Sequence, residues 1–142
     1  EEIKRAQRHG DALGICIMDV DHFKHINDRF GHDMGDQALC RIAAVVQDSV
    51  RSYDICGRWG GEEFLLLLPH TDCEEALAVV HRLRDCIQKI YISEGDGGVY
   101  LSASFGLTSL QVREEDPDIV LRRADQALFR AKDAGRNRVE LG

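Results

Sequence analysis

The chain has 142 residues, of which 18 are basic and 25 acidic, for a formal charge of −7, and 44% are hydrophobic. The length and apolar share suit one domain with its own core, and the acidic excess argues against a nucleic-acid-binding surface. No apolar run approaches the roughly 20 residues of a membrane helix, and no signal-peptide pattern is present. We therefore expect a single cytoplasmic domain over residues 1–142, with no nucleic-acid partner and no direct membrane contact.

The cysteines show no metal-ligand spacing, and their number is odd. Both observations predict buried free thiols in a reducing compartment rather than disulfides or a zinc site. The five residues are Cys16, Cys40, Cys56, Cys73 and Cys86.

The hydrophobic pattern predicts alternating strands and helices along the chain. Residues 1–9 permit a helix but begin without a capping signal, so we expect that this domain was cut from a longer chain. The further predicted elements are a strand over residues 13–18, a short helix or turn followed by a loop over 22–35, a helix from 35, a hairpin over 55–59 and 64–68, a helix capped at 71–72, a Gly-rich loop over 94–98, a strand over 99–107, a helix from about 117 to 135 and an edge strand over 139–141.

This order of elements contains strand, helix, strand, strand, helix and strand, which is the ferredoxin-like pattern. The predicted fold class is therefore α/β of the α+β kind, with a central sheet flanked by helices. In such a sheet the first strand lies centrally, so its end and the tip of the hairpin share one edge.

Carboxylates lie at both of these strand ends. Asp19 ends the first strand, and Glu62 lies at the hairpin tip. With the Val20 carbonyl they supply a partial oxygen shell of the kind that Mg²⁺ completes with water and phosphate oxygens. The alternative is that both are solvated loop acids. If only one of the two acids were present, we would favour that alternative. Two acidic clusters on neighbouring strands favour the metal site.

Glycines precede the acids of the hairpin. Gly60 and Gly61 permit unusual backbone conformations and leave room for a ligand close to the main chain. Glu63 adds a second carboxylate that a turn alone does not need. The hairpin tip is therefore a candidate binding site rather than only a connection.

Two segments could bind phosphate. The turn after the first strand can aim the amides of His22 and Phe23 at an anion, and Lys24 adds a positive charge. Residues 122–138 hold six basic and two acidic side chains, a local excess that suits a triphosphate. A solvated helix face with paired charges is the alternative, and composition alone favours it.

Asn27 and Asp36 could read a purine base. A carboxylate accepts from N1–H and the 2-amino group of guanine, whereas it is repelled by the N1 acceptor of adenine. The alternative is an Asx turn at Asn27 and a helix N-cap at Asp36. These residues taken alone favour that alternative.

Five motifs in register make the chain similar to a known family. In chain order they are Asp-Val-Asp-His-Phe-Lys-His-Ile-Asn-Asp, Phe-Gly-His-Asp-Met-Gly-Asp, Arg-Trp-Gly-Gly-Glu-Glu-Phe, Ser-Phe-Gly and Ala-Lys-Asp-Ala-Gly-Arg-Asn. Over residues 13–138 the chain resembles the GGDEF domain of diguanylate cyclases, in its GGEEF form. The resemblance implies a mostly antiparallel sheet related to the palms of nucleotide cyclases and polymerases.

The resemblance also implies a role for each candidate residue. It makes Asp19, the Val20 carbonyl and Glu62 ligands of Mg²⁺, with Mn²⁺ as an alternative ion, and it places Glu63 in the catalytic signature. It implies that Asn27 and Asp36 recognise guanine, rather than forming an Asx turn and a helix N-cap. The triphosphate would be bound by the amides of His22 and Phe23 and by the side chains of Lys24, Lys132 and Arg136.

The implied reaction condenses two GTP molecules into cyclic di-GMP and two pyrophosphates across a homodimer. Arg51 and Asp54 match an Arg-x-x-Asp inhibitory product site, to which Arg82 would contribute; by spacing alone they are an ordinary surface pair. The family's Asp-x-Leu-Thr turn, which lies upstream of the first motif, is absent, so we expect an N-terminal regulatory region in the native protein, which could be membrane-anchored.

Two other functions remain alternatives. A non-catalytic cyclic di-GMP receptor would keep only the inhibitory site, and the complete set of signature residues ranks it lower. A palm-type domain acting on other nucleotides is disfavoured by Asn27 and Asp36.

Overall fold

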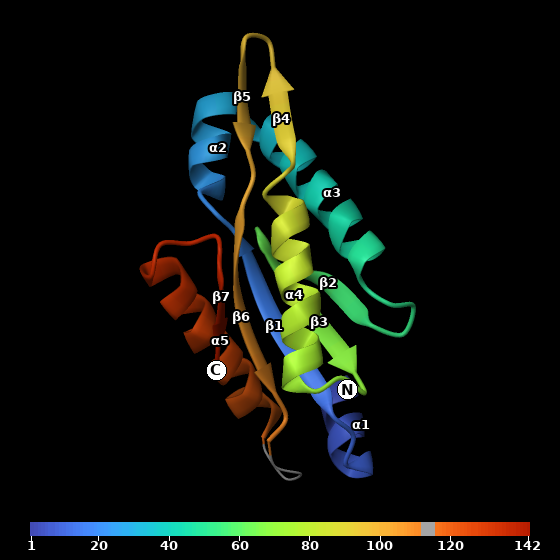
Figure 1. Cartoon of the computed structure of the whole chain (residues 1–142). Helices are drawn as coiled ribbons and strands as arrows, with labels where there is room; N and C mark the ends of the chain where they lie inside the picture. Colours follow the sequence, from blue (N-terminus) through green and yellow to red (C-terminus); the bar gives the residue numbers. More distant parts are fainter. Residues whose placement is uncertain (112–115) are drawn as a thin grey trace.

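A central five-stranded sheet organises the molecule (Figure 1). In the computed structural model, which describes residues 1–111 and 116–142, the strand order is β2-β3-β1-β6-β7. All neighbours are antiparallel except β6 and β7. The strands are β1 (Leu13–Val20), β2 (Ile55–Gly60), β3 (Glu63–Pro69), β6 (Ala103–Ser109) and β7 (Val139–Leu141). The predicted mostly antiparallel sheet with a central first strand is confirmed.

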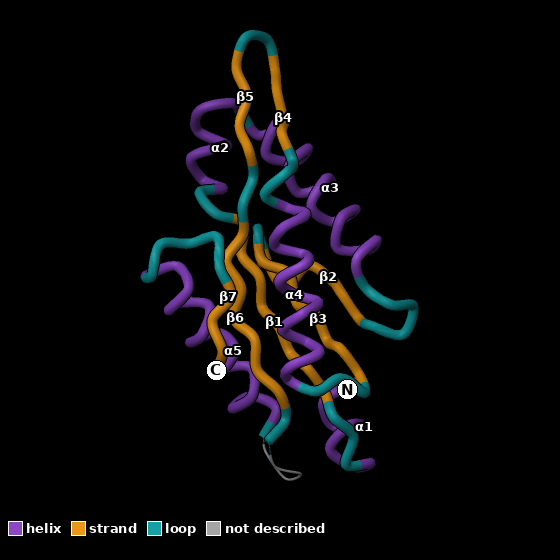
Figure 2. Tube along the Cα trace, viewed as in Figure 1, coloured by secondary structure: helices purple, strands orange, loops and turns teal. Residues whose placement is uncertain are grey.

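Helices cover both faces of this sheet, as Figure 2 shows. Side chains on β1 alternate between the faces, as the pleat of a strand requires. Cys16 and Met18 pack with the apolar sides of α3 and α4, whereas Ile15 and Ile17 pack with those of α1 and α5. The strand is therefore apolar along its length because both faces are buried. The helices are α1 (Glu2–His9), α2 (Phe23–Phe30), α3 (His32–Ser49), α4 (Cys73–Ile87) and α5 (Pro117–Asp133).

The segment after β1 is more regular than predicted. Residues 23–30 form α2, and α3 begins at His32 rather than at residue 35. Gly31, with φ 90° and ψ 165°, separates the two helices and allows the chain to turn. The alternative interpretation of an Asx turn at Asn27 and an N-cap at Asp36 is therefore wrong, because both residues lie inside helices.

The single strand predicted over residues 99–107 is divided into two strands. The chain forms a separate hairpin of β4 (Tyr91–Glu94) and β5 (Gly97–Tyr100), which projects from one end of the sheet before β6 begins (Figure 1). Gly95, with φ 61°, supports the tight turn. The rings of Tyr91 and Tyr100 pack across the hairpin with centroids 4.9 Å apart. The Gly-rich segment is thus a hairpin turn rather than an open loop.

The capping prediction for the fourth helix is confirmed. The Asp72 carboxylate accepts from the Glu75 amide at 2.8 Å, and the Glu75 side chain accepts from the Asp72 amide at 3.4 Å. This reciprocal pair satisfies two amides that the helix itself leaves unpaired.

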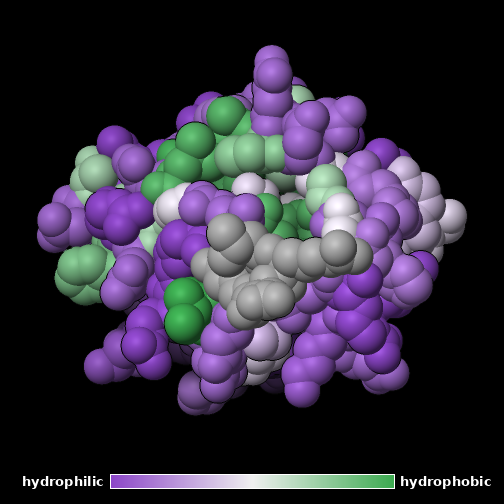
Figure 3. Space-filling view, turned by 90° about the horizontal axis from the view of Figure 1, so that it is seen from below, coloured by the Kyte–Doolittle hydropathy of each residue, from purple (hydrophilic) through white to green (hydrophobic). Residues whose placement is uncertain are grey.

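The cysteines are less buried than predicted. Cys16 is fully buried, and burial raises the pKa of its thiol far above the ordinary range, but Cys40 is exposed and the others are partly exposed. All five are free thiols, as predicted. The surface seen from below is mostly hydrophilic, with one hydrophobic group above the centre of the view and smaller ones toward its left and lower left (Figure 3). Within the described ranges, no helix has the length and apolar content needed to span a bilayer.

Candidate active site

A cavity of about 180 Å³ lies where the end of β1, the tip of the β2–β3 hairpin and the end of α5 meet. Antiparallel pairing of β1 with β3 sets Asp19 opposite Glu63, and the Val20 amide donates to the Glu62 carbonyl at 3.2 Å. The cavity brings together most of the residues predicted to bind metal and phosphate. Its lining is Asp19, Val20, Asp21, His22, Phe23, Lys24, Glu62, Lys132 and Arg136.

The hairpin tip depends on the glycine at position 61. Gly61 has φ 49°, a left-handed conformation that side chains other than Asn and Asp rarely adopt, and its carbonyl accepts from the Arg58 guanidinium. A Cβ atom at Gly60 or Gly61 would meet no atom of the protein within 4 Å. The space beside both glycines is therefore open to a ligand.

Asp19 and Lys132 form an ion pair inside the cavity. Lys132 Nζ lies 2.7 Å from Asp19 Oδ2, and the Asp19 side chain is 10% exposed. Burial raises the pKa of Asp19 above its ordinary value of 3.8, although the Lys132 ammonium acts in the opposite direction. The effect of desolvation on the pKa of Asp19 is thus larger than the effect of the ion pair. A further cation next to Asp19 would reduce the free-energy cost of keeping this carboxylate charged and buried.

Few oxygen ligands come from the protein at this site. Among the described residues there is no group of three His, Cys, Asp or Glu side chains close enough to hold a metal ion together. Two carboxylates and one carbonyl form an incomplete hard-oxygen set, which fits an ion that keeps several waters and binds substrate phosphates. Asp19, Val20 and Glu62 fit Mg²⁺ better than they fit zinc.

Glu63 is also shifted toward its protonated form. Burial raises its pKa above the ordinary value of 4.5, and the charge of Asp19 adds to the shift. A carboxyl group with a higher pKa in the folded chain than in the unfolded chain favours folding below the unfolded-state pKa, and this contribution is lost as pH rises through the folded-state pKa.

We therefore expect Glu63→Gln to raise the melting temperature of the metal-free domain at pH 7. The gain should shrink as pH falls through the raised pKa of Glu63 and be largely lost below about 4.5, where wild-type Glu63 is neutral in both the folded and the unfolded chain. Thermal unfolding followed by circular dichroism at pH 7 and pH 4, in the presence of a chelator, measures both values. An equal difference at both pH values would contradict this account of Glu63.

The phosphate-binding candidates lie around the start of α2. His22 has a left-handed backbone, with φ 55°, and precedes the helix without making a side-chain cap. The first amides of α2 and its positive dipole end are therefore available to an anion. Lys24 is the second residue of this helix and Arg136 lies beyond the end of α5, so residues far apart in the sequence line one cavity.

Asn27 and Asp36 lie on α2 and α3, outside the lining of the cavity. Asn27 Oδ1 is buried and has no hydrogen-bond partner among the described residues. A Cβ atom at Gly35 would lie 1.8 Å from this oxygen, so glycine at position 35 makes room for the amide. Asp36 is exposed. An unpaired buried acceptor beside an exposed carboxylate is a suitable pair for a ligand with several donors.

A second cavity, of about 330 Å³, brings together Arg51, Asp54 and Arg82. Asp54 Oδ2 accepts from the Arg51 amide at 2.7 Å, whereas Asp54 Oδ1 is buried without a partner among the described residues. The Arg51 guanidinium donates to Thr71 Oγ1 at 2.6 Å. Glu75, which the sequence did not indicate, also lines this cavity.

Asp21 has a structural role that the sequence interpretation missed. Its carboxylate accepts from Ser102 Oγ and Ser104 Oγ, each at 2.6 Å, and from the Asn137 amide at 3.0 Å. The available signal was the pair of serines on one face of a predicted strand. Only the fold shows that this face meets the end of β1.

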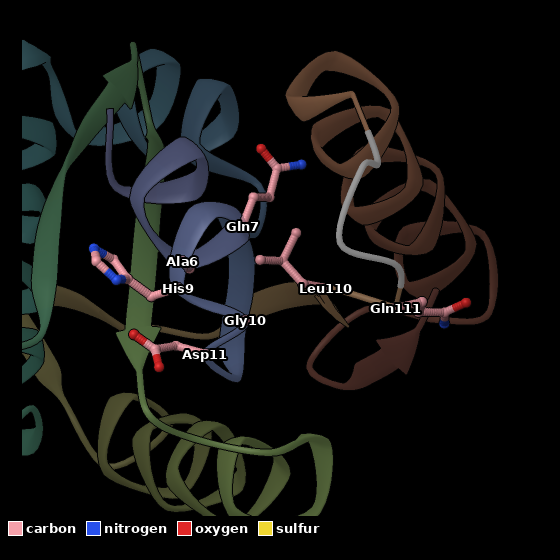
Figure 4. A pocket seen from close by; sticks show the side chains of 7 residues that line it. All are labelled: Ala6, Gln7, His9, Gly10, Asp11, Leu110 and Gln111. Atoms are coloured by element: carbon pink, nitrogen blue, oxygen red, sulfur yellow. The ribbon is translucent and has the colours of Figure 1, made fainter.

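A larger cavity, of about 470 Å³, lies at the other end of β1 (Figure 4). It is lined by the end of α1 and by residues after β6, including His9, Asp11 and Leu110. Its lining among the described residues holds one carboxylate, Asp11, and no Lys or Arg, whereas the 180 Å³ cavity combines several carboxylates with three Lys and Arg side chains. The chemistry is therefore assigned to the smaller cavity.

The family model described as "Diguanylate cyclase, GGDEF domain" matches residues 1–138. The chain belongs to the GGDEF family. Diguanylate cyclase DgcP of Pseudomonas aeruginosa is 40% identical over 141 residues, which are 99% of this GGDEF domain and 21% of that protein. The chain thus spans about a fifth of this relative's length.

Solved GGDEF-domain structures agree with the fold. The active GGEEF domain of a diguanylate cyclase from Vibrio cholerae is 37% identical with a TM-score of 0.89, covering 96% of this chain and 86% of the other. The GGDEF domain of DgcB from Caulobacter crescentus, solved in complex with c-di-GMP, is 28% identical with a TM-score of 0.93. The match covers 99% of this chain and 85% of that chain. The sheet and helices described above are therefore those of a GGDEF domain.

Proposed function

We propose that this domain is a diguanylate cyclase that condenses two GTP molecules into cyclic di-GMP and two pyrophosphates. The observation that carries the proposal is the 180 Å³ cavity, in which Asp19 and Glu62 lie beside Lys24, Lys132 and Arg136. Paired carboxylates beside three basic side chains suit a metal–triphosphate complex. The similarity to diguanylate cyclases over nearly the whole chain supports the same activity.

Each half of the reaction joins one GTP to the other. The 3′ oxygen of one GTP attacks the α-phosphorus of its partner, the bond from that phosphorus to the β-phosphate oxygen breaks, and pyrophosphate leaves. The 3′ proton passes to water or to a carboxylate of Glu62 or Glu63. A second, identical step closes the ring, so that atoms and charge balance without an oxidant or reductant.

Apart from any transfer of the 3′ proton to Glu62, the side chains of the cavity bind and orient the substrates. Asp19, Glu62 and the Val20 carbonyl would hold Mg²⁺, which when bound lowers the charge at the α-phosphate and favours the 3′ alkoxide. Lys24, Lys132, Arg136 and the amides at the start of α2 would bind the triphosphate. Positioning and electrostatic stabilisation then supply most of the rate.

Guanine would be read by Asn27 and Asp36. The buried, unpaired Asn27 Oδ1 can accept from the base, and the Asp36 carboxylate can accept from N1–H and the 2-amino group. Adenine lacks the 2-amino donor and presents an acceptor at N1. This pair therefore makes GTP, rather than ATP, the proposed substrate.

Each protomer would hold one GTP, so the product requires two protomers. Cyclic di-GMP contains two equivalent nucleotides, which a two-fold dimer presents to each other symmetrically. Incubation with GTP and Mg²⁺, followed by nucleotide chromatography, tests the activity. Cyclic di-GMP and pyrophosphate are expected, and binding of cyclic di-GMP without turnover would instead favour a receptor.

We expect specific activity to rise with protein concentration in the range where the domain is monomeric, because productive encounters are bimolecular. Initial rates per protomer, measured across a dilution series with light scattering in parallel, test this. Specific activity that stays constant throughout the monomeric range would contradict catalysis across a dimer.

The 330 Å³ cavity would bind the product as an inhibitor. Arg51 and Arg82 can donate to phosphate or to the O6/N7 edge of guanine, and the unpaired Asp54 Oδ1 can accept from guanine N1–H. Product bound there could link two protomers and hold their active sites apart. Inhibition would then not require competition with GTP.

Arg51→Ala is expected to weaken cyclic di-GMP binding by about tenfold or more, because it removes a charge-assisted contact worth roughly 1.5–3 kcal/mol. Calorimetry with cyclic di-GMP measures the change. Arg41→Ala, which truncates an exposed arginine on α3, is a matched control. Equal product affinity in wild type and Arg51→Ala would leave Arg51 and Asp54 as an ordinary ion pair.

A further inference from the structure

Asp21 is a buried carboxylate to which the proposed chemistry gives no role. The residue is 5% exposed. Oδ1 accepts from Ser104, and Oδ2 accepts from Ser102 and from the Asn137 amide. The Asp21 amide donates in turn to the Ser102 carbonyl at 2.9 Å. One side chain thus joins the end of β1, the start of β6 and the connection between α5 and β7.

This connection carries Arg136 in an unusual backbone conformation. Arg136 and Asn137 both have left-handed φ values, 64° and 47°. Residues with side chains keep such conformations only where their surroundings hold them. The Arg136 amide donates to Ala131 at the end of α5, and the Asn137 amide donates to Asp21. The pair is therefore held from both sides.

Other contacts of Asn137 lead to a different helix. Its carbonyl accepts from Arg84 of α4 at 3.5 Å, and its side-chain amide donates at 3.2 Å to Gln88, the residue that follows α4. The contact of Asn137 with Asp21 leads instead to the end of β1, the strand that carries Asp19. It ties the connection between α5 and β7 to the end of β1, alongside the Lys132–Asp19 ion pair.

We propose that Asp21 is a positioning residue that holds Arg136 in register with Asp19, so that triphosphate and metal are bound together. Asp21 is not assigned as a metal ligand, because direct coordination would have to compete with a buried amide and two hydroxyl donors. The inference rests on the proposed function, in which Arg136 binds the triphosphate.

A double-mutant cycle tests this coupling. The probe is 3′-deoxy-GTP, which lacks the attacking hydroxyl, and its dissociation constant is measured by calorimetry with Mg²⁺ present. Asp21→Ala is expected to weaken binding by about tenfold, and Arg136→Ala by at least as much. In the Arg136→Ala background, Asp21→Ala should add less than about twofold.

Equal weakening by Asp21→Ala in both backgrounds would overturn the inference alone. If Arg136→Ala left the affinity unchanged, the triphosphate assignment of the proposed function would fall together with this inference. Asp118→Ala, at an exposed acid in the first turn of α5, controls for loss of one negative charge, and it should leave the affinity unchanged.

A conservative variant separates positioning from charge and from folding. In Asp21→Asn, the amide oxygen can keep the bonds from Asn137 and Ser102, and the amide nitrogen can donate to Ser104, whose hydroxyl also accepts. The dissociation constant should stay within about threefold of wild type, with an unchanged Mg²⁺ requirement. A folded Asp21→Asn that binds as weakly as Asp21→Ala, or that needs far more Mg²⁺, would overturn the inference.

Discussion

Glu62→Gln is expected to lower the rate of GTP turnover by about two orders of magnitude or more. Gln keeps the size and one oxygen of Glu62 but removes a negative charge from the proposed metal shell. Metal assistance contributes several kcal/mol to stabilisation of the transition state, and each 1.4 kcal/mol changes the rate tenfold. Initial rates over a range of Mg²⁺ concentrations measure the effect.

The fold should tolerate this change, because Glu62 lies at the partly exposed tip of the hairpin. Circular dichroism of the variant is expected to match that of wild type. Glu74→Gln, at an exposed position in the first turn of α4, provides the matched control and should retain activity. Wild-type turnover by Glu62→Gln would show that the metal site has been placed wrongly.

The second large effect concerns the choice of base. Wild type is expected to prefer GTP strongly over ATP, and Asp36→Ala should reduce this preference by about fivefold to 150-fold. That range corresponds to the roughly 1–3 kcal/mol that one unmatched polar group costs when desolvated. The ratio of kcat/KM for GTP to that for ATP is the measured quantity.

Two further variants sharpen this test. Gly35→Ala would place a Cβ atom 1.8 Å from the present position of Asn27 Oδ1, so it should displace the amide and lower GTP selectivity without removing Asn27. Asp33→Ala truncates an exposed acid in the first turn of the same helix and should leave selectivity unchanged. Equal rates with ATP and GTP in wild type would exclude the base-reading role.

The sequence alone predicted the central part of the fold because its local signals agree with each other. The alternation of apolar residues, the capping residues at Asp72 and Glu75 and the Gly-Gly turn each favour one local structure. The fourth helix and the β2–β3 hairpin follow directly from them. The order of the elements then restricts the sheet to a ferredoxin-like topology, with β1 at its centre.

The sequence patterns predicted the wrong local structure where the same residues are compatible with two structures. Residues 94–98 are rich in glycine, which suits an open loop as well as the turn of a hairpin. The alternation over residues 99–107 suits one strand as well as two. At the break between β5 and β6 the Ser102 carbonyl accepts from the Asp21 amide, a bond between residues 81 positions apart. No local pattern records such a contact.

For the site, the sequence determined which residue types are present and where the strands end, because carboxylates after apolar runs are visible without a structure. The tertiary structure decided what each group contacts: Lys132 with Asp19, and Asn137 with Asp21. These contacts join α5 and its following turn to β1, more than 100 residues earlier. Burial and long-range contacts, which shift the pKa of Asp19 and fix the backbone at Arg136, arise only when the chain packs.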